Sequence, residues 1–125
     1  MPARVVLADD HEGVRHMLRL RLQLLNCEVV GEAENGRQAI AQVREHRPDI
    51  VVMDLEMPEM NGIDATKEIK KEWPDTVVYG YTALAHADRV DFLLAAGASA
   101  NFFKDDYSGL IDAISQHPGP RPNHT

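Results

Sequence analysis

The sequence predicts an α/β fold in which a five-stranded parallel sheet is covered by helices on both faces. Two observations favour this fold class. Short apolar, often β-branched runs alternate five times with amphipathic stretches at helical spacing within 125 residues. The run from Ile50 to Met53 is continuously apolar, as expected of a strand that is buried on both faces. Among doubly wound sheets, the order 2-1-3-4-5 fits the number of strands.

The expected strands are residues 4–8, 28–33, 49–53, 76–81 and, with a weaker pattern, 100–103. Asn35 and Asn61 are suitable caps for the second and third helices, and Gly97 is expected to end the fourth. Apolar stripes predict five helices, and we expect the stripes to face the core: Val14, Met17, Leu18, Leu22 and Leu25; Ala39, Ile40 and Val43; Ala65, Thr66, Ile69 and Trp73; Val90, Leu93 and Leu94; Tyr107, Leu110, Ile111 and Ile114.

The composition is typical of one globular domain. Apolar residues make up 44% of the chain, and 13 basic against 20 acidic residues give a formal charge of −7. This charge argues against direct nucleic-acid binding, and no apolar run approaches the roughly 20 residues of a membrane span. Residues 3–116 are expected to form the domain, and the Pro-rich residues 117–125 a disordered tail or the start of a linker.

No secretory signal is recognised, and the single Cys27 excludes a disulfide framework, so we expect a cytoplasmic protein. The six histidines show no zinc-ligand spacing and are interpreted as surface or rim groups. The composition therefore directs attention to the acidic side chains.

Polar side chains gather where the expected strands end. Asp9 and Asp10 follow the first strand, Asp54 the third, Thr82 the fourth and Lys104 the fifth. Sites in open parallel sheets form beyond the carboxyl ends of the strands, so we expect these groups to share one rim. Taken singly, each has an ordinary explanation: a helix cap, a strand residue or a solvated cation. Their joint occurrence favours a functional site.

Three ionised aspartates in one crevice repel each other at neutral pH. A hard divalent cation relieves this repulsion, and Mg²⁺ needs few carboxylates because it keeps several waters. Such a cation can bridge to a phosphoryl group, while Lys104 can neutralise another phosphoryl oxygen and Thr82 can donate a hydrogen bond. Asp54 is then a candidate nucleophile, since aspartate can form an aspartyl-phosphate.

The ordered set of residues resembles the receiver domains of two-component response regulators, which have a flavodoxin-like fold. The resemblance covers about residues 3–116. It rests on Asp9-Asp10, on Asp54 with the Met57-Pro58 and Asn61-Gly62 that follow it, on Thr82-Ala83 and on Lys104.

The resemblance implies that Asp54 accepts a phosphoryl group from a phosphohistidine of a histidine kinase or a phosphotransfer protein, assisted by Thr82 and Lys104. It implies that Mg²⁺ is held by Asp10, Asp54 and the backbone carbonyl of Glu56, with Asp9 acting through water. A signalling function without turnover of small molecules is expected. Phosphorylation would switch the conformation and control an output partner or a homodimer.

Two residues depart from what the resemblance and the strand pattern lead us to expect. Receiver domains usually have an aromatic residue three positions before the lysine, which follows the threonine inward on phosphorylation; this chain has Asn101 there. Gly80 lies inside an expected strand, where a glycine weakens pairing or admits a close neighbour.

Three other functions remain open on the sequence. They are an aspartyl-nucleophile phosphatase such as a haloacid-dehalogenase-like enzyme, a flavodoxin-like cofactor binder, and a receiver-shaped scaffold that does not accept phosphate. The phosphatase pattern favours an aspartate two positions after the nucleophile, where this chain has Glu56. Asp9, Asp10 and Glu12 would repel a flavin phosphate. Asn101, in place of the usual aromatic residue, leaves the non-phosphorylated scaffold as an alternative.

Overall fold

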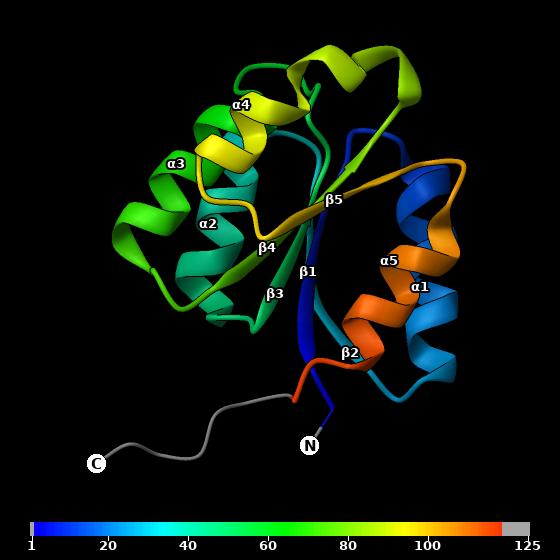
Figure 1. Ribbon diagram of the computed structural model, residues 1–125. Helices are drawn as coiled ribbons and strands as arrows, with labels where there is room; N and C mark the ends of the chain where they lie inside the picture. Colours follow the sequence, from blue (N-terminus) through cyan, green and yellow to red (C-terminus); the bar gives the residue numbers. More distant parts are fainter. Residues whose placement is uncertain (1, 119–125) are drawn as a thin grey trace.

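The computed structural model describes residues 2–118, and a parallel sheet runs through its centre (Figure 1). The strands are β1 (Arg4–Ala8), β2 (Glu28–Ala33), β3 (Ile50–Met53), β4 (Val77–Thr82) and β5 (Ala100–Phe103). They pair in the order β2-β1-β3-β4-β5, and every neighbouring pair is parallel. The predicted fold class and strand order are confirmed, although β3 and β4 each begin one residue later than expected. The expected tail lies, from residue 119 onward, outside the described residues.

The helices are α1 (Glu12–Leu24), α2 (Gly36–His46), α3 (Gly62–Glu72), α4 (Val90–Ala95) and α5 (Tyr107–Ser115). Figure 1 shows α1 and α5 on one face of the sheet and α2, α3 and α4 on the other. The side chains of Asn35 and Asn61 accept hydrogen bonds from backbone N–H groups in the first turns of α2 and α3, as predicted. Within residues 2–118, no helix is both long and apolar enough to cross a membrane.

One helical segment was not predicted. A 3₁₀ helix, η1 (Leu84–Arg89), directly precedes α4, and the backbone leaves helical geometry at His86. This segment has no buried residue, so it lacks the apolar stripe by which a helix is recognised in a sequence. It lies immediately after the strand that carries Thr82.

The core consists of two apolar clusters, one on each face of the sheet. The residues of β3 are at most 2% exposed, because helices cover both faces, as the continuous apolar run predicts. Three stripe residues were wrongly expected in the core: Leu25, Leu94 and Tyr107 are 42%, 40% and 39% exposed. Leu25 follows the last residue of α1, and the short α4 buries only Leu93.

Gly80 lies inside β4 because two side chains occupy the space beside it. A Cβ atom at this position would come within 2.4 Å of Asn101 Oδ1 and within 2.5 Å of Leu93 Cδ2. Asn101 stands opposite Gly80 in the register between β4 and β5. The close neighbour that the sequence suggested for this glycine is therefore Asn101, together with Leu93 from α4.

Gly80→Ala should lower the free energy of unfolding by about 1–3 kcal/mol, because the added methyl group overfills the space beside Asn101. Gly13→Ala, in α1, is the matched control: nothing lies within 4 Å of its added Cβ, and the change should raise stability by up to about 1 kcal/mol. Urea unfolding measures both. Adding Asn101→Ala to Gly80→Ala should recover part of the loss. Equal stabilities of the two single variants would show that the neighbours of Gly80 move without cost.

Candidate functional site

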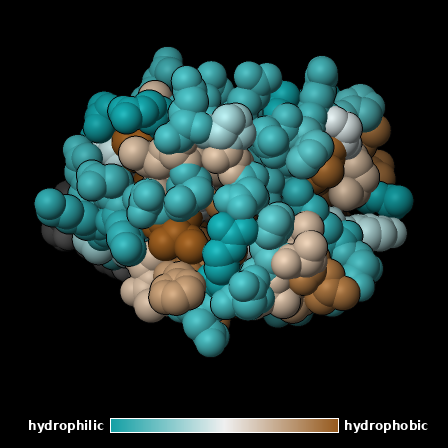
Figure 2. Space-filling view, turned by 90° about the horizontal axis from the view of Figure 1, so that it is seen from above, coloured by the Kyte–Doolittle hydropathy of each residue, from teal (hydrophilic) through white to brown (hydrophobic). Residues whose placement is uncertain are grey.

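Backbone hydrogen bonds extend the sheet beyond the strands and fix the residues of the candidate site. The N–H groups of Asp9, Asp54 and Lys104 donate to carbonyls of neighbouring strands at 3.0, 2.9 and 2.9 Å, respectively. The three side chains therefore start from positions as rigid as the sheet itself. Seen from above in Figure 2, hydrophilic side chains cover most of this end of the molecule, with smaller hydrophobic areas between them.

The segment after Asp54 approaches it closely. A Cβ atom on Gly62 would lie 2.0 Å from the backbone carbonyl oxygen of Asp54, and the N–H of Gly62 donates to the carbonyl of Leu55 at 2.8 Å. Only glycine fits such a contact with backbone. The Asn61-Gly62 step thus caps α3 and brings its first turn against the residue that the sequence singles out as the nucleophile.

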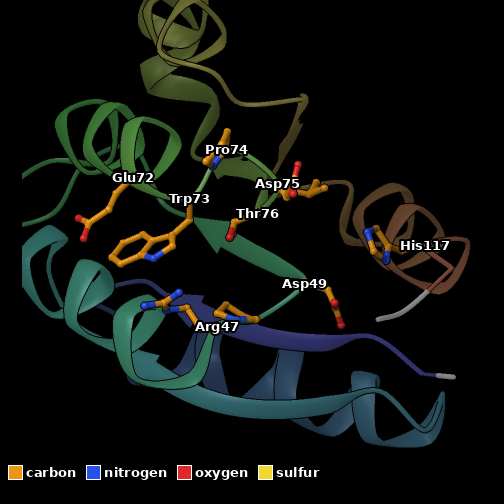
Figure 3. Close-up of a pocket in the computed structure, with 10 residues that line it drawn as sticks. Arg47, Asp49, Glu72, Trp73, Pro74, Asp75, Thr76 and His117 are labelled. Carbon is orange, nitrogen blue, oxygen red and sulfur yellow. The ribbon is translucent and has the colours of Figure 1, made fainter. Parts of the chain in front are cut away.

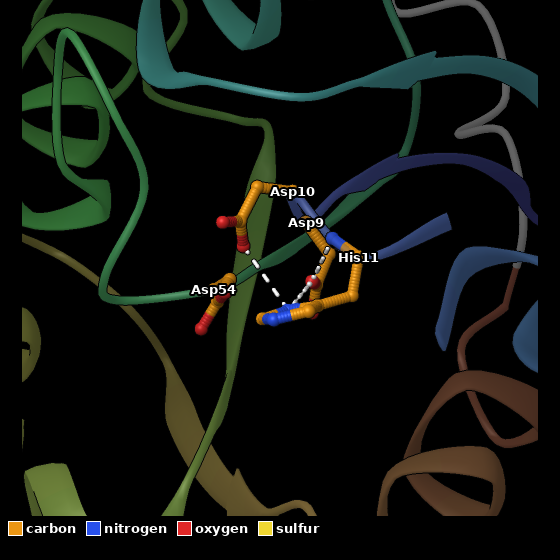
Figure 4. Close-up of side chains that lie close together, drawn as sticks. All are labelled: Asp9, Asp10, His11 and Asp54. Atoms are coloured by element: carbon orange, nitrogen blue, oxygen red, sulfur yellow. Dashed lines mark hydrogen bonds and ion pairs between the residues drawn. The ribbon is translucent and has the colours of Figure 1, made fainter. Parts of the chain in front are cut away.

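Four side chains come together at the ends of β1 and β3: Asp9, Asp10, His11 and Asp54 (Figure 4). One potential ligand atom from each lies within 4.8 Å of the others, so these groups could hold a metal ion. Asp9 and Asp54 are buried, whereas Asp10 and His11 are exposed. Carboxylate oxygens are the ligands that Mg²⁺ prefers, so the three aspartates of this group fit that ion. The predicted convergence of the aspartates is observed.

The sequence interpretation missed His11 as a member of this group. Its Nδ1 lies 3.1 Å from Asp9 Oδ1 and 3.2 Å from Asp10 Oδ1. Its place directly after the two aspartates was a usable signal. The alternative that Asp9 or Asp10 is the cap of the first helix is wrong, because His11 is the N-cap residue of α1. Asp9 instead accepts a hydrogen bond from the N–H of His11, at 2.9 Å to Oδ1.

Lys104 supplies positive charge to the buried carboxylates. Its Nζ lies 2.8 Å from Asp9 Oδ2 and 3.4 Å from Asp54 Oδ2. Burial acts against the charged ammonium, but the hydrogen bond to Asp9 and the charges of both carboxylates outweigh it and raise the pKa of Lys104. The ammonium is closer to Asp9 than to Asp54, so Asp54 is the less well compensated of the two.

The pKa of Asp54 is raised from 3.8 to about 7. Burial is the main cause, and the charge of Asp9 adds to it, while the charge and hydrogen bond of Lys104 act in the opposite direction. The group therefore lacks positive charge when all its carboxylates are ionised. A divalent cation bound there would supply it.

Thr82 and Glu56 border this group in different ways. Thr82 is completely buried, and its Oγ1 has no hydrogen-bond partner among the described residues. The Glu56 carboxylate accepts hydrogen bonds of 3.2 and 2.5 Å from Arg89, which lower its pKa. The Glu56 side chain is thus engaged by η1, a contact that sequence reasoning missed. The predicted role of its backbone carbonyl as a metal ligand stays a prediction.

A hollow of about 390 Å³ lies at the other end of the sheet, before β3 and β4 begin (Figure 3). Two of its charged groups are already engaged: the Arg47 guanidinium lies 5.2 Å from the centre of the Trp73 ring, and Asp49 accepts a hydrogen bond from the N–H of Arg4 at 2.8 Å. The hollow is separated from Asp54 by the length of the strands. It is not part of the candidate site.

The sequence model of the response regulator receiver domain matches residues 5–115. The chain therefore belongs to the receiver-domain family of two-component response regulators. It is 44% identical to the chemotaxis protein CheY of Thermotoga maritima over 117 residues, which cover 93% of this chain and 98% of that protein. Its structure is similar to that of the response regulator domain of Thermotoga maritima CheB, with a TM-score of 0.86, 29% identity and coverage of 98% of this chain and 100% of that chain.

Other relatives are longer. The chain is 43% identical over 118 residues to the uncharacterized transcriptional regulatory protein YhcZ of Bacillus subtilis, which covers 93% of this chain but 55% of that protein. The chain thus spans about half the length of this relative. The family assignment excludes two of the functions that the sequence left open, a haloacid-dehalogenase-like phosphatase and a flavodoxin-like cofactor binder. Whether the domain accepts phosphate is a separate question.

In the absence of metal, Asp54 should make the domain less stable as the pH rises. Its pKa is about 7 in the folded protein against an ordinary value of 3.8, so its stabilising contribution is complete below about pH 4 and is lost as the pH rises through about 7. Asp54→Asn cannot ionise at this position. Its free energy of unfolding, relative to that of the wild type, should therefore rise by on the order of 2 kcal/mol between about pH 5 and 8. Urea unfolding in the presence of EDTA measures this. A difference between the two proteins that does not change with pH would contradict it.

Mg²⁺ should raise the melting temperature of the wild type, because a ligand that binds only the folded state stabilises it. At a concentration about tenfold above the dissociation constant the gain is about 1.4 kcal/mol, or several degrees for a domain of this size. Asp10→Ala should lose most of this shift, with NaCl at matched ionic strength as the control. A shift of equal size in Asp10→Ala would argue against binding at this group.

Proposed function

We propose that this receiver domain accepts a phosphoryl group on Asp54 in a Mg²⁺-dependent reaction, and that phosphorylation changes its conformation to control an output. One observation carries the proposal: the Asp54 carboxylate lies in one group with two other aspartates and the Lys104 ammonium. The donor would be a phosphohistidine on a histidine kinase or a phosphotransfer protein.

The chemistry follows from the side chains present. A carboxylate oxygen of Asp54 forms the bond to phosphorus as the bond between phosphorus and the histidine nitrogen breaks, and that nitrogen keeps the electron pair. Bound Mg²⁺ would supply charge that offsets the phosphoryl oxygens. Asp10, Asp54 and the carbonyl of Glu56 would bind it directly, and Asp9 through water.

Lys104 and Thr82 have roles toward the phosphoryl oxygens. The Lys104 ammonium, now shared between Asp9 and Asp54, can pair with one oxygen once the Asp54 carboxylate carries the phosphoryl group. The Thr82 hydroxyl lacks a hydrogen-bond partner within residues 2–118, and it gains an acceptor when a phosphoryl oxygen arrives. The Thr82 hydroxyl therefore interacts better with the phosphorylated site than with the free one, whereas the Lys104 ammonium has an anionic partner in both.

The output is expected to be a partner protein, an attached domain or a second copy of the chain. Relatives of this chain include a chemotaxis protein and a transcriptional regulatory protein, and either kind of output is compatible with a receiver domain. The domain boundaries of 3–116, a cytoplasmic location, the lack of small-molecule turnover and the lack of direct nucleic-acid binding stay predictions.

Incubation with acetyl phosphate and Mg²⁺ should add one phosphoryl group to the wild type, detected by intact-mass spectrometry. Asp54→Asn should abolish the adduct, since the amide is not a nucleophile of comparable strength. Asp112→Asn, an exposed change on α5, is the matched control and should be labelled as fully as the wild type. Chelation by EDTA should prevent labelling. An adduct of equal yield on Asp54→Asn would refute the assignment of the phosphorylated residue.

The switch should run from Thr82 to Asn101. Both amide atoms of Asn101 are buried without hydrogen-bond partners among the described residues, so a rearrangement that gives them partners is favourable. On phosphorylation, amide resonances should shift around Thr82 and also across β5 near Asn101. Thr82→Ala should lose the distant shifts, and Asn101→Ala should keep only the shifts around Thr82. Distant shifts that persist in Thr82→Ala would show that the signal takes another route.

A further inference from the structure

Arg15 is a buried arginine that contacts the turn between the two aspartates after β1. It lies on α1, and its side chain is only 9% exposed. Its Nη1 donates to the backbone carbonyl of Asp9 at 2.6 Å, and its Nε donates to Glu32 Oε1 at 2.9 Å. A second carboxylate, that of Glu34, lies 3.8 Å from Nη2. Because a buried charge is costly unless it is paired, these acids on and after β2 explain how the guanidinium is held here.

The carbonyl that Arg15 binds belongs to the peptide bond between Asp9 and Asp10. A peptide unit is planar, so fixing its carbonyl also fixes the direction in which the backbone of Asp10 begins. Two other polar groups of Asp9 are also held: its N–H donates to the carbonyl of Ala33, and its Oδ1 accepts from the N–H of His11. Arg15 thus supplies the remaining backbone hydrogen bond that orients the turn.

We propose that Arg15 is a positioning residue for the metal site, which it serves by holding the Asp9–Asp10 peptide in the orientation that directs the Asp10 carboxylate toward Asp54. The inference rests on the proposed function, because it takes Asp10 as a Mg²⁺ ligand. Arg15 does not touch the ion; it acts through the backbone of Asp9. Groups that orient a metal ligand in this way typically change metal affinity by about 10–100-fold when they are removed.

Arg19 provides a matched control for a purely structural role. It also lies on α1 and donates to Glu32, at 2.5 Å to Oε2, but its side-chain contacts with Glu32 and His16 do not reach the turn that Arg15 holds. The two arginines therefore share the link between α1 and β2, whereas the hydrogen bond to Asp9 belongs to Arg15. The direction in which Mg²⁺ affinity changes further separates a positioning role from a purely electrostatic one. Loss of a nearby positive charge strengthens cation binding through Coulomb's law, whereas loss of positioning weakens it.

The test is Mg²⁺ titration by calorimetry of the metal-free wild type, Arg15→Met and Arg19→Met. Arg15→Met should bind Mg²⁺ about tenfold more weakly, whereas Arg19→Met should bind it as tightly as the wild type or more tightly. Amide spectra without metal give a second readout: the Asp10 resonance should shift in Arg15→Met and stay in place in Arg19→Met. Thermal unfolding establishes that each variant is folded.

Wild-type affinity in a folded Arg15→Met, or an equal loss in both variants, would overturn the proposal. If Arg15→Met does not fold, Arg15→Lys replaces it. Lysine keeps the charge beside Glu32, but it cannot donate to Glu32 and to the Asp9 carbonyl with the geometry of a guanidinium. Mg²⁺ should therefore bind several-fold more weakly to Arg15→Lys. Unchanged affinity in this variant would overturn the proposal too. A wild type that binds no Mg²⁺ would instead refute the metal site itself, and with it this inference.

Discussion

The candidate site depends on one ammonium group that is shared between buried carboxylates. Lys104 Nζ contacts Asp9 and Asp54, and Asp10 adds a third acid to the same group. The acids cannot move apart, because hydrogen bonds to neighbouring strands fix the backbone of Asp9 and Asp54. Their repulsion is therefore built into the sheet and has to be offset by charge from outside. This constraint makes a divalent cation a suitable ligand. Once the cation is bound, its charge also balances that of a phosphoryl group.

Strand order explains why these acids meet. β1 and β3 are neighbours although β2 separates them in the sequence, so the residues that follow them come out side by side. β4 and β5 continue the sheet on the same side and bring Thr82 and Lys104 to the same end. The loops add what the strands cannot: Gly62 lets α3 start against Asp54, and Arg15 holds the turn after β1.

The sequence was sufficient to predict the strands, their order and the convergence of the aspartates with Lys104, because each depends on a local pattern or on the rules of parallel sheets. It was not sufficient for contacts between distant segments. Glu56 and Arg89 are 33 positions apart, and no periodicity relates them. Leu25 shows the limit of periodicity itself, since it continues the stripe of α1 in spacing but lies beyond the end of the helix.

Lys104 follows β5, which is an edge strand, whereas the aspartates follow the central strands β1 and β3. All four residues of β5 are partly exposed, while those of β3 are fully buried. Segments of this kind open locally at lower free energy than the centre of a sheet, so the cation belongs to a less stable part of the domain than the acids. Opening of β5 would separate the ammonium from carboxylates that stay in place. Protection of the β5 backbone against hydrogen exchange is therefore linked to the charge on aspartates that follow other strands.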